Sequence, residues 1–151
     1  MRAEIHIREA QEADSGFISA LLAEMGHPLE TETVAANLRA MNALAPRYGT
    51  FVAVMNQSVV GVVSAFASYV LHRPHGVGRI SVLTVARAFA GRGIGSALLL
   101  HAETFLRQLG CGRLEVTSAA HRQEAHEFYR RRGYIQQGVR FAREFEGHHS
   151  A

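Results

Sequence analysis

The feature that most constrains the fold is a short apolar run that leads, through a glycine-rich turn, into an amphipathic helix. The run is Val82–Val85, the turn is Gly91–Ser96 (GRGIGS), and apolar residues then recur at helical spacing as far as Leu109. Such an apolar run is typical of a buried strand, and Gly110 supplies a helix stop. A strand that feeds a helix in this way is half of a β–α–β crossover, which predicts an α/β fold.

The rest of the chain alternates between strand and helix patterns. Strands are predicted at 3–8, 50–55, 59–71, 79–85, 113–118 and, as a pair around Gly138, 134–145; helices are predicted at 15–25 (after the caps Asp14 and Ser15), 31–45, 94–109 and 122–132. Crossovers make neighbouring strands parallel and hairpins make them antiparallel, so we expect a mixed sheet. No repeat or linker interrupts residues 1–151, which are expected to form a single domain.

Composition excludes several classes of function. Hydrophobic residues make up 48% of the chain and charged residues 19%, as in a soluble globular domain, and no uninterrupted apolar stretch predicts a membrane partner. All 16 basic residues are arginines, yet a net charge of +3 is too small to predict nucleic-acid binding. Cys111 stands alone, which excludes a disulfide within the chain, and no ligand spacing predicts a metal. The first residues contain no apolar signal-peptide core, so we expect a cytoplasmic protein.

The glycine-rich turn predicts an anion site. The first N–H groups of a helix have no partner within it and carry the positive end of its dipole, while glycines let phosphate oxygens approach the backbone and Arg92 adds charge. A P-loop is excluded because no lysine follows Gly93. A dinucleotide fingerprint fits poorly, since its last glycine would fall on Ser96 or Leu98.

A third pattern fits both this turn and a later block. Strand, Gly-x-Gly-x-Gly-Ser turn and helix resemble the acyl-CoA pyrophosphate loop of the GNAT superfamily of N-acetyltransferases, and the block Glu124–Tyr134 (EAHEFYRRRGY) resembles that family's Ala-x-x-Phe-Tyr-x-x-x-Gly-Phe/Tyr block. The resemblance implies an α/β (α+β) fold. Its mixed, mostly antiparallel sheet would have about six to seven strands with a splayed central parallel pair, and about four helices would cover it.

The resemblance also implies an activity. Such a protein transfers acetyl from acetyl-CoA, its co-substrate, to a primary amine of a small molecule or peptide, by direct attack in a ternary complex and without a metal. Two alternatives stay open: a non-catalytic acyl-CoA-binding module and, more distantly, a nucleotide-binding oxidoreductase. A homodimer through the final strand pair is also compatible with the resemblance.

Site residues follow from the resemblance position by position. Pantetheine would bind to the backbone of Leu83, Thr84 and Val85 and lie near Arg122; the pyrophosphate would bind to Gly91, Arg92, Gly93, Ile94, Gly95 and Ser96. Tyr129 would protonate the leaving thiolate, since a phenol of pKa about 10 is protonated at neutral pH. Glu115 would be the general base, directly or through a water.

Each of these roles has a structural alternative. Tyr129 could be an amphipathic residue at the edge of the core, and Glu115 could be a strand glutamate that is either solvated or paired with an arginine. His72, His75 and His121 are further candidates for the base. The chain departs from the family at Ala90, where the family usually has Arg or Gln, so Arg87 or Arg92 would have to supply that phosphate contact.

Overall fold

The computed structural model describes residues 4–118 and 122–148, and the chain divides into two compact units, Met1–Val116 and Thr117–Ala151. The first unit contains β1 (His6–Glu9), η1 (Glu12–Asp14), α1 (Ser15–Met25), α2 (Thr31–Asn42), β2 (Tyr48–Met55), β3 (Ser58–Ser68), β4 (Gly76–Val85), η2 (Arg87–Phe89), α3 (Ile94–Gln108) and β5 (Cys111–Val116). The second contains α4 (Gln123–Arg131). The predicted strand residue Ala3 and the candidate base His121 lie outside the described residues.

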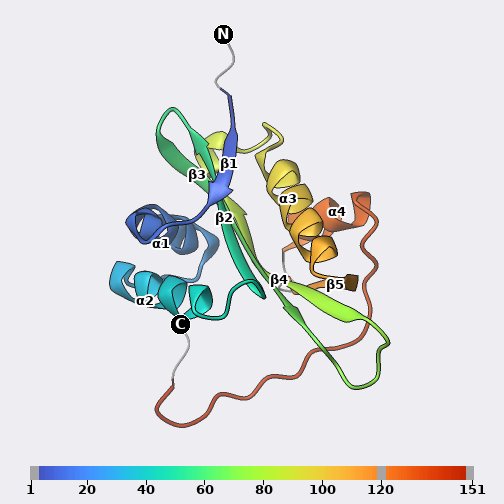
Figure 1. The fold of residues 1–151 in the computed structure, drawn as a ribbon. Helices are drawn as coiled ribbons and strands as arrows, with labels where there is room; N and C mark the ends of the chain where they lie inside the picture. The colour runs from blue at the N-terminus through green and yellow to red at the C-terminus, as the bar shows by residue number, and fades with distance from the viewer. Residues whose placement is uncertain (1–3, 119–121, 149–151) are drawn as a thin grey trace. The chain divides into compact units, whose positions relative to one another are not determined.

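The sheet of the first unit has five strands in the order β1-β2-β3-β4-β5 (Figure 1). The pairs β1/β2, β2/β3 and β3/β4 are antiparallel, and β4/β5 is parallel. The β4–α3–β5 connection is thus the crossover predicted from the apolar run, the glycine turn and the helix. The mixed α/β class and the parallel pair are confirmed.

The sheet has fewer strands than the about six to seven predicted. The difference is the pair expected at 134–145, because the described residues 134–148 contain no strand. Their large apolar side chains are mostly exposed, with exposed fractions of 78% for Ile135, 81% for Val139 and 91% for Phe141. Apolar residues in such a segment favour a strand only where a neighbouring strand completes the ladder and a core covers one face.

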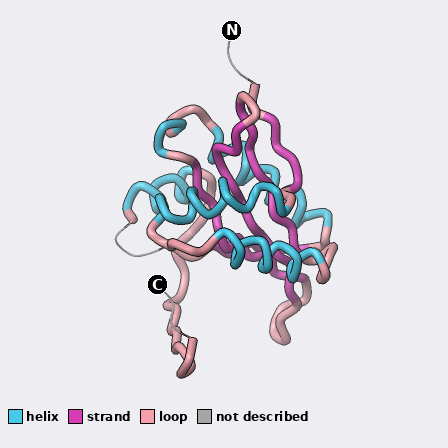
Figure 2. Tube along the Cα trace, turned by 90° about the vertical axis from the view of Figure 1, so that its left-hand side faces the viewer, coloured by secondary structure: helices cyan, strands magenta, loops and turns pink. Residues whose placement is uncertain are grey.

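Helices cover both faces of this sheet: α1 and α2 one face, and α3 the other (Figure 1). Figure 2 looks onto the face with α1 and α2. On that face Ile18, Leu21 and Leu38 pack with Val52 and Val62 of the sheet. No helix among residues 4–118 and 122–148 combines the length and apolar character needed to cross a membrane.

Two strand glycines let α3 approach the sheet closely. A Cβ on Gly61 would lie 2.9 Å from Cδ1 of Leu98, and one on Gly78 would lie 2.7 Å from Cδ1 of Leu106. Leu98 and Leu106 are both completely buried. The two glycines therefore fix how near the helix that follows the glycine turn lies to β3 and β4.

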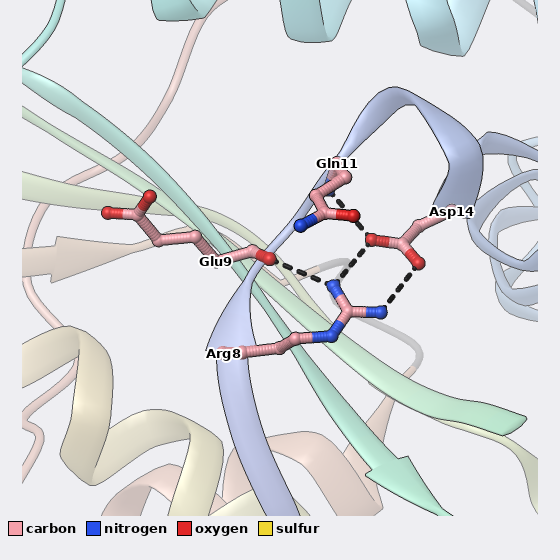
Figure 3. Close-up of polar contacts among 4 residues, drawn as sticks. All are labelled: Arg8, Glu9, Gln11 and Asp14. Atoms are coloured by element: carbon pink, nitrogen blue, oxygen red, sulfur yellow. Dashed lines mark hydrogen bonds and ion pairs between the residues drawn. The ribbon is translucent and has the colours of Figure 1, made fainter. Parts of the chain in front are cut away.

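Asp14 anchors the start of α1 to β1 (Figure 3). It stands at the N-cap position predicted for it, but its side chain makes no capping hydrogen bond. Instead Oδ2 and Oδ1 accept hydrogen bonds from Nη1 and Nη2 of Arg8 at 2.8 and 2.9 Å, and Oδ2 accepts another from the Gln11 N–H at 2.7 Å. The bond with Arg8 lowers the pKa of the Asp14 carboxyl; burial opposes this effect, and the Gln11 N–H supports it.

Asp14→Asn should lower the free energy of unfolding at pH 7 by about 2–3 kcal/mol, because it leaves Arg8 without its charged partner. The folded-state pKa of Asp14 lies below its unfolded value, so its contribution is complete above the unfolded pKa of about 4 and is lost as the pH falls through the folded pKa. The difference between wild type and variant in urea denaturation should therefore shrink below about pH 4. A difference that persists at low pH would contradict an ionic role.

Glu12→Gln is the matched control. It weakens the ion pair of Glu12 with Arg39 (2.9 Å), in which both side chains are about half exposed. Such a pair contributes little, so the change should stay within about 0.5 kcal/mol.

Candidate active site

The strands β4 and β5 separate at a bulge. Along β4 the antiparallel partners of Ser64 and Ala65 are Val82 and Ile80, so Ser81 is an extra residue in the ladder. The parallel ladder with β5 covers Gly76 to Ile80, and among the described residues it does not extend beyond Ile80 and Val116. Among the described residues, the second half of β4 is thus paired with β3 on one side and with no strand on the other, which is the splay implied by the resemblance.

The backbone groups on this open side come from Leu83 and Val85. The N–H of Ala86 donates to the carbonyl of Val60 at 2.8 Å, so this pair is a hydrogen-bonded pair of the antiparallel ladder. Hydrogen-bonded and non-hydrogen-bonded pairs alternate, so Thr84 also bonds to β3, while Leu83 and Val85 direct their N–H and C=O groups away from it. Of the three residues predicted to bind pantetheine, Leu83 and Val85 therefore direct their backbone groups away from β3, and Thr84 directs its own toward β3.

The glycine turn follows directly. After η2, Gly91 and Gly93 have φ angles of +76° and +80°, which side chains rarely adopt, and a Cβ on either would meet nothing within 4 Å. Gly93 is the N-cap of α3 and, as a glycine, supplies no capping side chain, and the first turn contains no acidic residue. Ile94 is 1% exposed and fastens the turn to the core. The turn is an exposed helix N-terminus that favours an anion.

The two arginines proposed to compensate for Ala90 differ in their surroundings. Nη2 of Arg87 donates to the carbonyl of Glu24 in α1 at 3.3 Å. The guanidinium of Arg92 lies 5.1 Å from the centre of the Phe89 ring, on the exposed surface of the turn. Arg92 is therefore the better placed of the two to meet a phosphate beside the turn.

The candidate base Glu115 is ion-paired. It lies on β5 in the paired part of the parallel ladder, opposite Arg79, and its Oε2 accepts a hydrogen bond from Nε of Arg113 at 2.9 Å. His75 lies against Gly112, and its Nδ1 is 3.1 Å from the Gly76 carbonyl. His72 is exposed in the loop between β3 and β4. Glu115 is thus opposite the first half of β4, and both histidines precede β4, so none of the three is next to Leu83 or Val85 in the sheet.

Tyr129 and Arg122 belong to the second unit. Tyr129 lies on α4, and its ring makes edge contacts with Phe128 and Tyr134 at centroid distances of 5.3 and 5.6 Å. Burial raises the pKa of its phenol, and the positive charge of Arg122 partly offsets the rise. The hydroxyl is therefore protonated at neutral pH, as a proton donor must be.

The arginine run that follows Tyr129 interacts locally. Arg130 and Arg131 lie 3.6 and 3.9 Å from carboxylate oxygens of Glu127. Arg132 donates to the Phe128 carbonyl at 2.9 Å and lies over the Phe128 ring. These contacts place positive charge at the C-terminal end of α4, where the helix dipole favours it.

Sequence reasoning missed the bulge at Ser81 and the short helix η2, since neither has a periodic signal. It also missed a hollow of about 520 Å³ between α3 and the strands β1 and β2, lined by residues that include Glu9, Phe51 and His101. This hollow contains none of the predicted site residues. Within the described part of the chain, no three His, Cys, Asp or Glu side chains are grouped so that they could hold a metal ion.

Comparison with known proteins identifies the family of this chain. The model of the acetyltransferase (GNAT) family matches residues 15–134. An aminoalkylphosphonate N-acetyltransferase of Salmonella typhimurium is 34% identical over 140 residues, which cover 91% of this chain and 89% of that protein.

Two solved structures share the fold. A transcriptional regulator from Bacillus halodurans superposes with a TM-score of 0.84 at 21% identity, covering 94% of this chain and 100% of that one. An aminoglycoside N-acetyltransferase in complex with CoA superposes with a TM-score of 0.80 at 17% identity, covering 95% and 97%. From the family match and the identity to the Salmonella enzyme, the chain belongs to the GNAT family of acetyltransferases and is an N-acetyltransferase.

Proposed function

We propose that this enzyme transfers acetyl from acetyl-CoA to the primary amine of a small aminoalkylphosphonate. The proposed binding of acetyl-CoA rests on the backbone groups of Leu83 and Val85 that point away from β3, and on the exposed, glycine-capped N-terminus of α3 that follows a few residues later. Amide groups along a strand suit the amides of pantetheine, and a glycine-rich helix N-terminus suits a pyrophosphate. A family relative solved with CoA supports the same ligand.

The chemistry then needs one bond made and one broken. The amine nitrogen bonds to the acetyl carbon while the carbon–sulfur bond breaks, the nitrogen loses a proton and the thiolate gains one. The N–H of Val85 would stabilise the negative charge on the thioester oxygen. Tyr129, from its place in the family block, would protonate the thiolate, and Arg122 would lie beside the pantetheine arm. Glu115 would receive the amine's proton through a water, since Arg113 occupies one carboxylate oxygen.

The acceptor class rests on the Salmonella relative, whose name states an aminoalkylphosphonate. A phosphonate dianion pairs well with guanidinium groups, and every basic residue of this chain is an arginine. The predicted single domain, homodimer and cytoplasmic location stay predictions.

The proposal predicts a preference for the phosphonate group. With acetyl-CoA present, 2-aminoethylphosphonate should release CoA thiol with a kcat/KM at least about tenfold above those of ethanolamine and β-alanine, which present the same amine without a phosphonate. Initial rates of thiol release measure this. Equal rates for all three amines would contradict the phosphonate. If the protein binds acetyl-CoA but none of the amines in a wider panel causes thiol release, the result would instead support a non-catalytic module.

A further inference from the structure

A reciprocal pair of hydrogen bonds joins α1 to the segment that leads into the glycine turn. The backbone N–H of Arg87 donates to Oε1 of Glu24 at 3.1 Å, and Nη2 of Arg87 donates to the backbone carbonyl of Glu24 at 3.3 Å. The Glu24 carbonyl is in the last turn of α1, where carbonyls have no partner within the helix and attract a positive charge.

This pair of hydrogen bonds between Glu24 and Arg87, called the Glu24–Arg87 clasp from here on, lies between the two parts of the proposed acyl-CoA site. On its N-terminal side, Ala86 is fixed to β3 by its bond to Val60 and packs against the core that α1 and α2 form with the sheet. On its C-terminal side, η2 closes through the bond from the Ala90 N–H to the Arg87 carbonyl, and the exposed turn with Gly91 follows. Glu24 is thus an acidic side chain, from another element, that holds the last structured turn before the glycines.

We propose that Glu24 is a positioning residue for acetyl-CoA, an inference that rests on the proposed function. Glycines lose the most conformational freedom when a ligand orders them, so a fixed entry into the turn reduces the cost of binding. Both partners are exposed, so the clasp contributes little to global stability. Its effect is expected in the affinity for acetyl-CoA, and not in the chemical step.

Glu24→Ala should raise the dissociation constant for acetyl-CoA about three- to tenfold, as expected for the loss of one exposed hydrogen bond to a carboxylate, while the bond from Nη2 of Arg87 to the backbone carbonyl of residue 24 is kept. The kcat at saturating acetyl-CoA and amine should stay within about twofold of wild type, and the urea midpoint should not change. Glu24→Gln should restore the wild-type dissociation constant, because its side-chain carbonyl accepts the same N–H. Calorimetry with acetyl-CoA, urea denaturation and steady-state kinetics measure these quantities.

Glu12→Ala is the matched control, since it removes an exposed glutamate with its own arginine partner, Arg39, away from η2. It should bind acetyl-CoA as wild type does. The inference is overturned if Glu24→Ala binds like wild type, or if Glu24→Gln is as weak as Glu24→Ala. Tighter binding by Glu24→Gln also overturns it, because Glu24 would then act by charge repulsion. Absence of acetyl-CoA binding by the wild-type protein would instead refute the proposed function itself.

Discussion

Gly93→Val should abolish the stabilisation of this protein by acetyl-CoA. At a free concentration of about 100 times its dissociation constant, acetyl-CoA should stabilise the wild-type protein by roughly 2.7 kcal/mol, and NAD should not. Gly93 has a φ of +80° at the N-cap of α3, with open space where a Cβ would point. A valine there is strained and projects into the approach to the helix N–H groups. Thermal unfolding with and without each ligand measures the effect.

Gly110→Val separates loss of the site from strain alone. Gly110 follows the other end of the same helix and has a φ of +87°, and a Cβ on it would also meet nothing within 4 Å. Its variant should lose comparable intrinsic stability but keep the full shift with acetyl-CoA. Gly93→Ala provides a milder variant if valine prevents folding. An undiminished shift in the Gly93 variants would mean that the turn is not the site.

Most of the fold could be predicted because its elements carry periodic patterns. The helix over 94–109 was expected from its apolar spacing and its two flanking glycines, and α3 spans Ile94–Gln108. The hairpin around Asn56 was expected from two β-branched runs, and β2 and β3 lie on either side of it. These patterns persist in the structure because each one places a continuous apolar face against the core.

The details that create the site have no such signal. Ser81 is an extra residue in β4. Its position as a bulge depends on how β4 pairs with β3, which the sequence of β4 alone does not specify. The bond between Glu24 and Arg87 joins residues far apart in the sequence. Conversely, residues 134–145 are predicted to form a strand pair around Gly138 but contain no strand, since a local sequence signal does not supply a partner strand.

The predicted site residues stay predictions, but the structure shows what surrounds each of them. The glycine turn has positive φ angles at Gly91 and Gly93 and a glycine at the N-cap of α3, which suit an anion site. The backbone N–H and C=O of Thr84, however, form hydrogen bonds to β3. Only the alternation of hydrogen-bonded and non-hydrogen-bonded pairs along β3 and β4 shows this. Glu115 lies two residues from Arg113 on β5, and the two form an ion pair, which is one of the structural alternatives named for this glutamate.

Tyr129→Phe should lower the steady-state rate of thiol release by about 10²–10⁴-fold, the usual contribution of general acid catalysis. The change removes the hydroxyl and keeps the ring that contacts Phe128 and Tyr134, so folding and acetyl-CoA affinity should be retained. Because the pKa of the Tyr129 phenol is raised, the wild-type enzyme should keep its proton donor throughout the neutral range and lose it only above the usual pKa of a tyrosine.

Tyr134→Phe is the matched control, since it removes a neighbouring phenol at a position where the family pattern accepts either Phe or Tyr. Its turnover should remain within about threefold of wild type. If Tyr129→Phe also stays within that range, water or the acidity of the CoA thiol suffices for the leaving group and Tyr129 is not the acid. If its acetyl-CoA affinity, measured by calorimetry, falls together with turnover, the hydroxyl serves binding or packing. Only a loss of turnover with intact affinity assigns the proton to Tyr129, because the affinity reports the bound ground state and the rate reports the transition state.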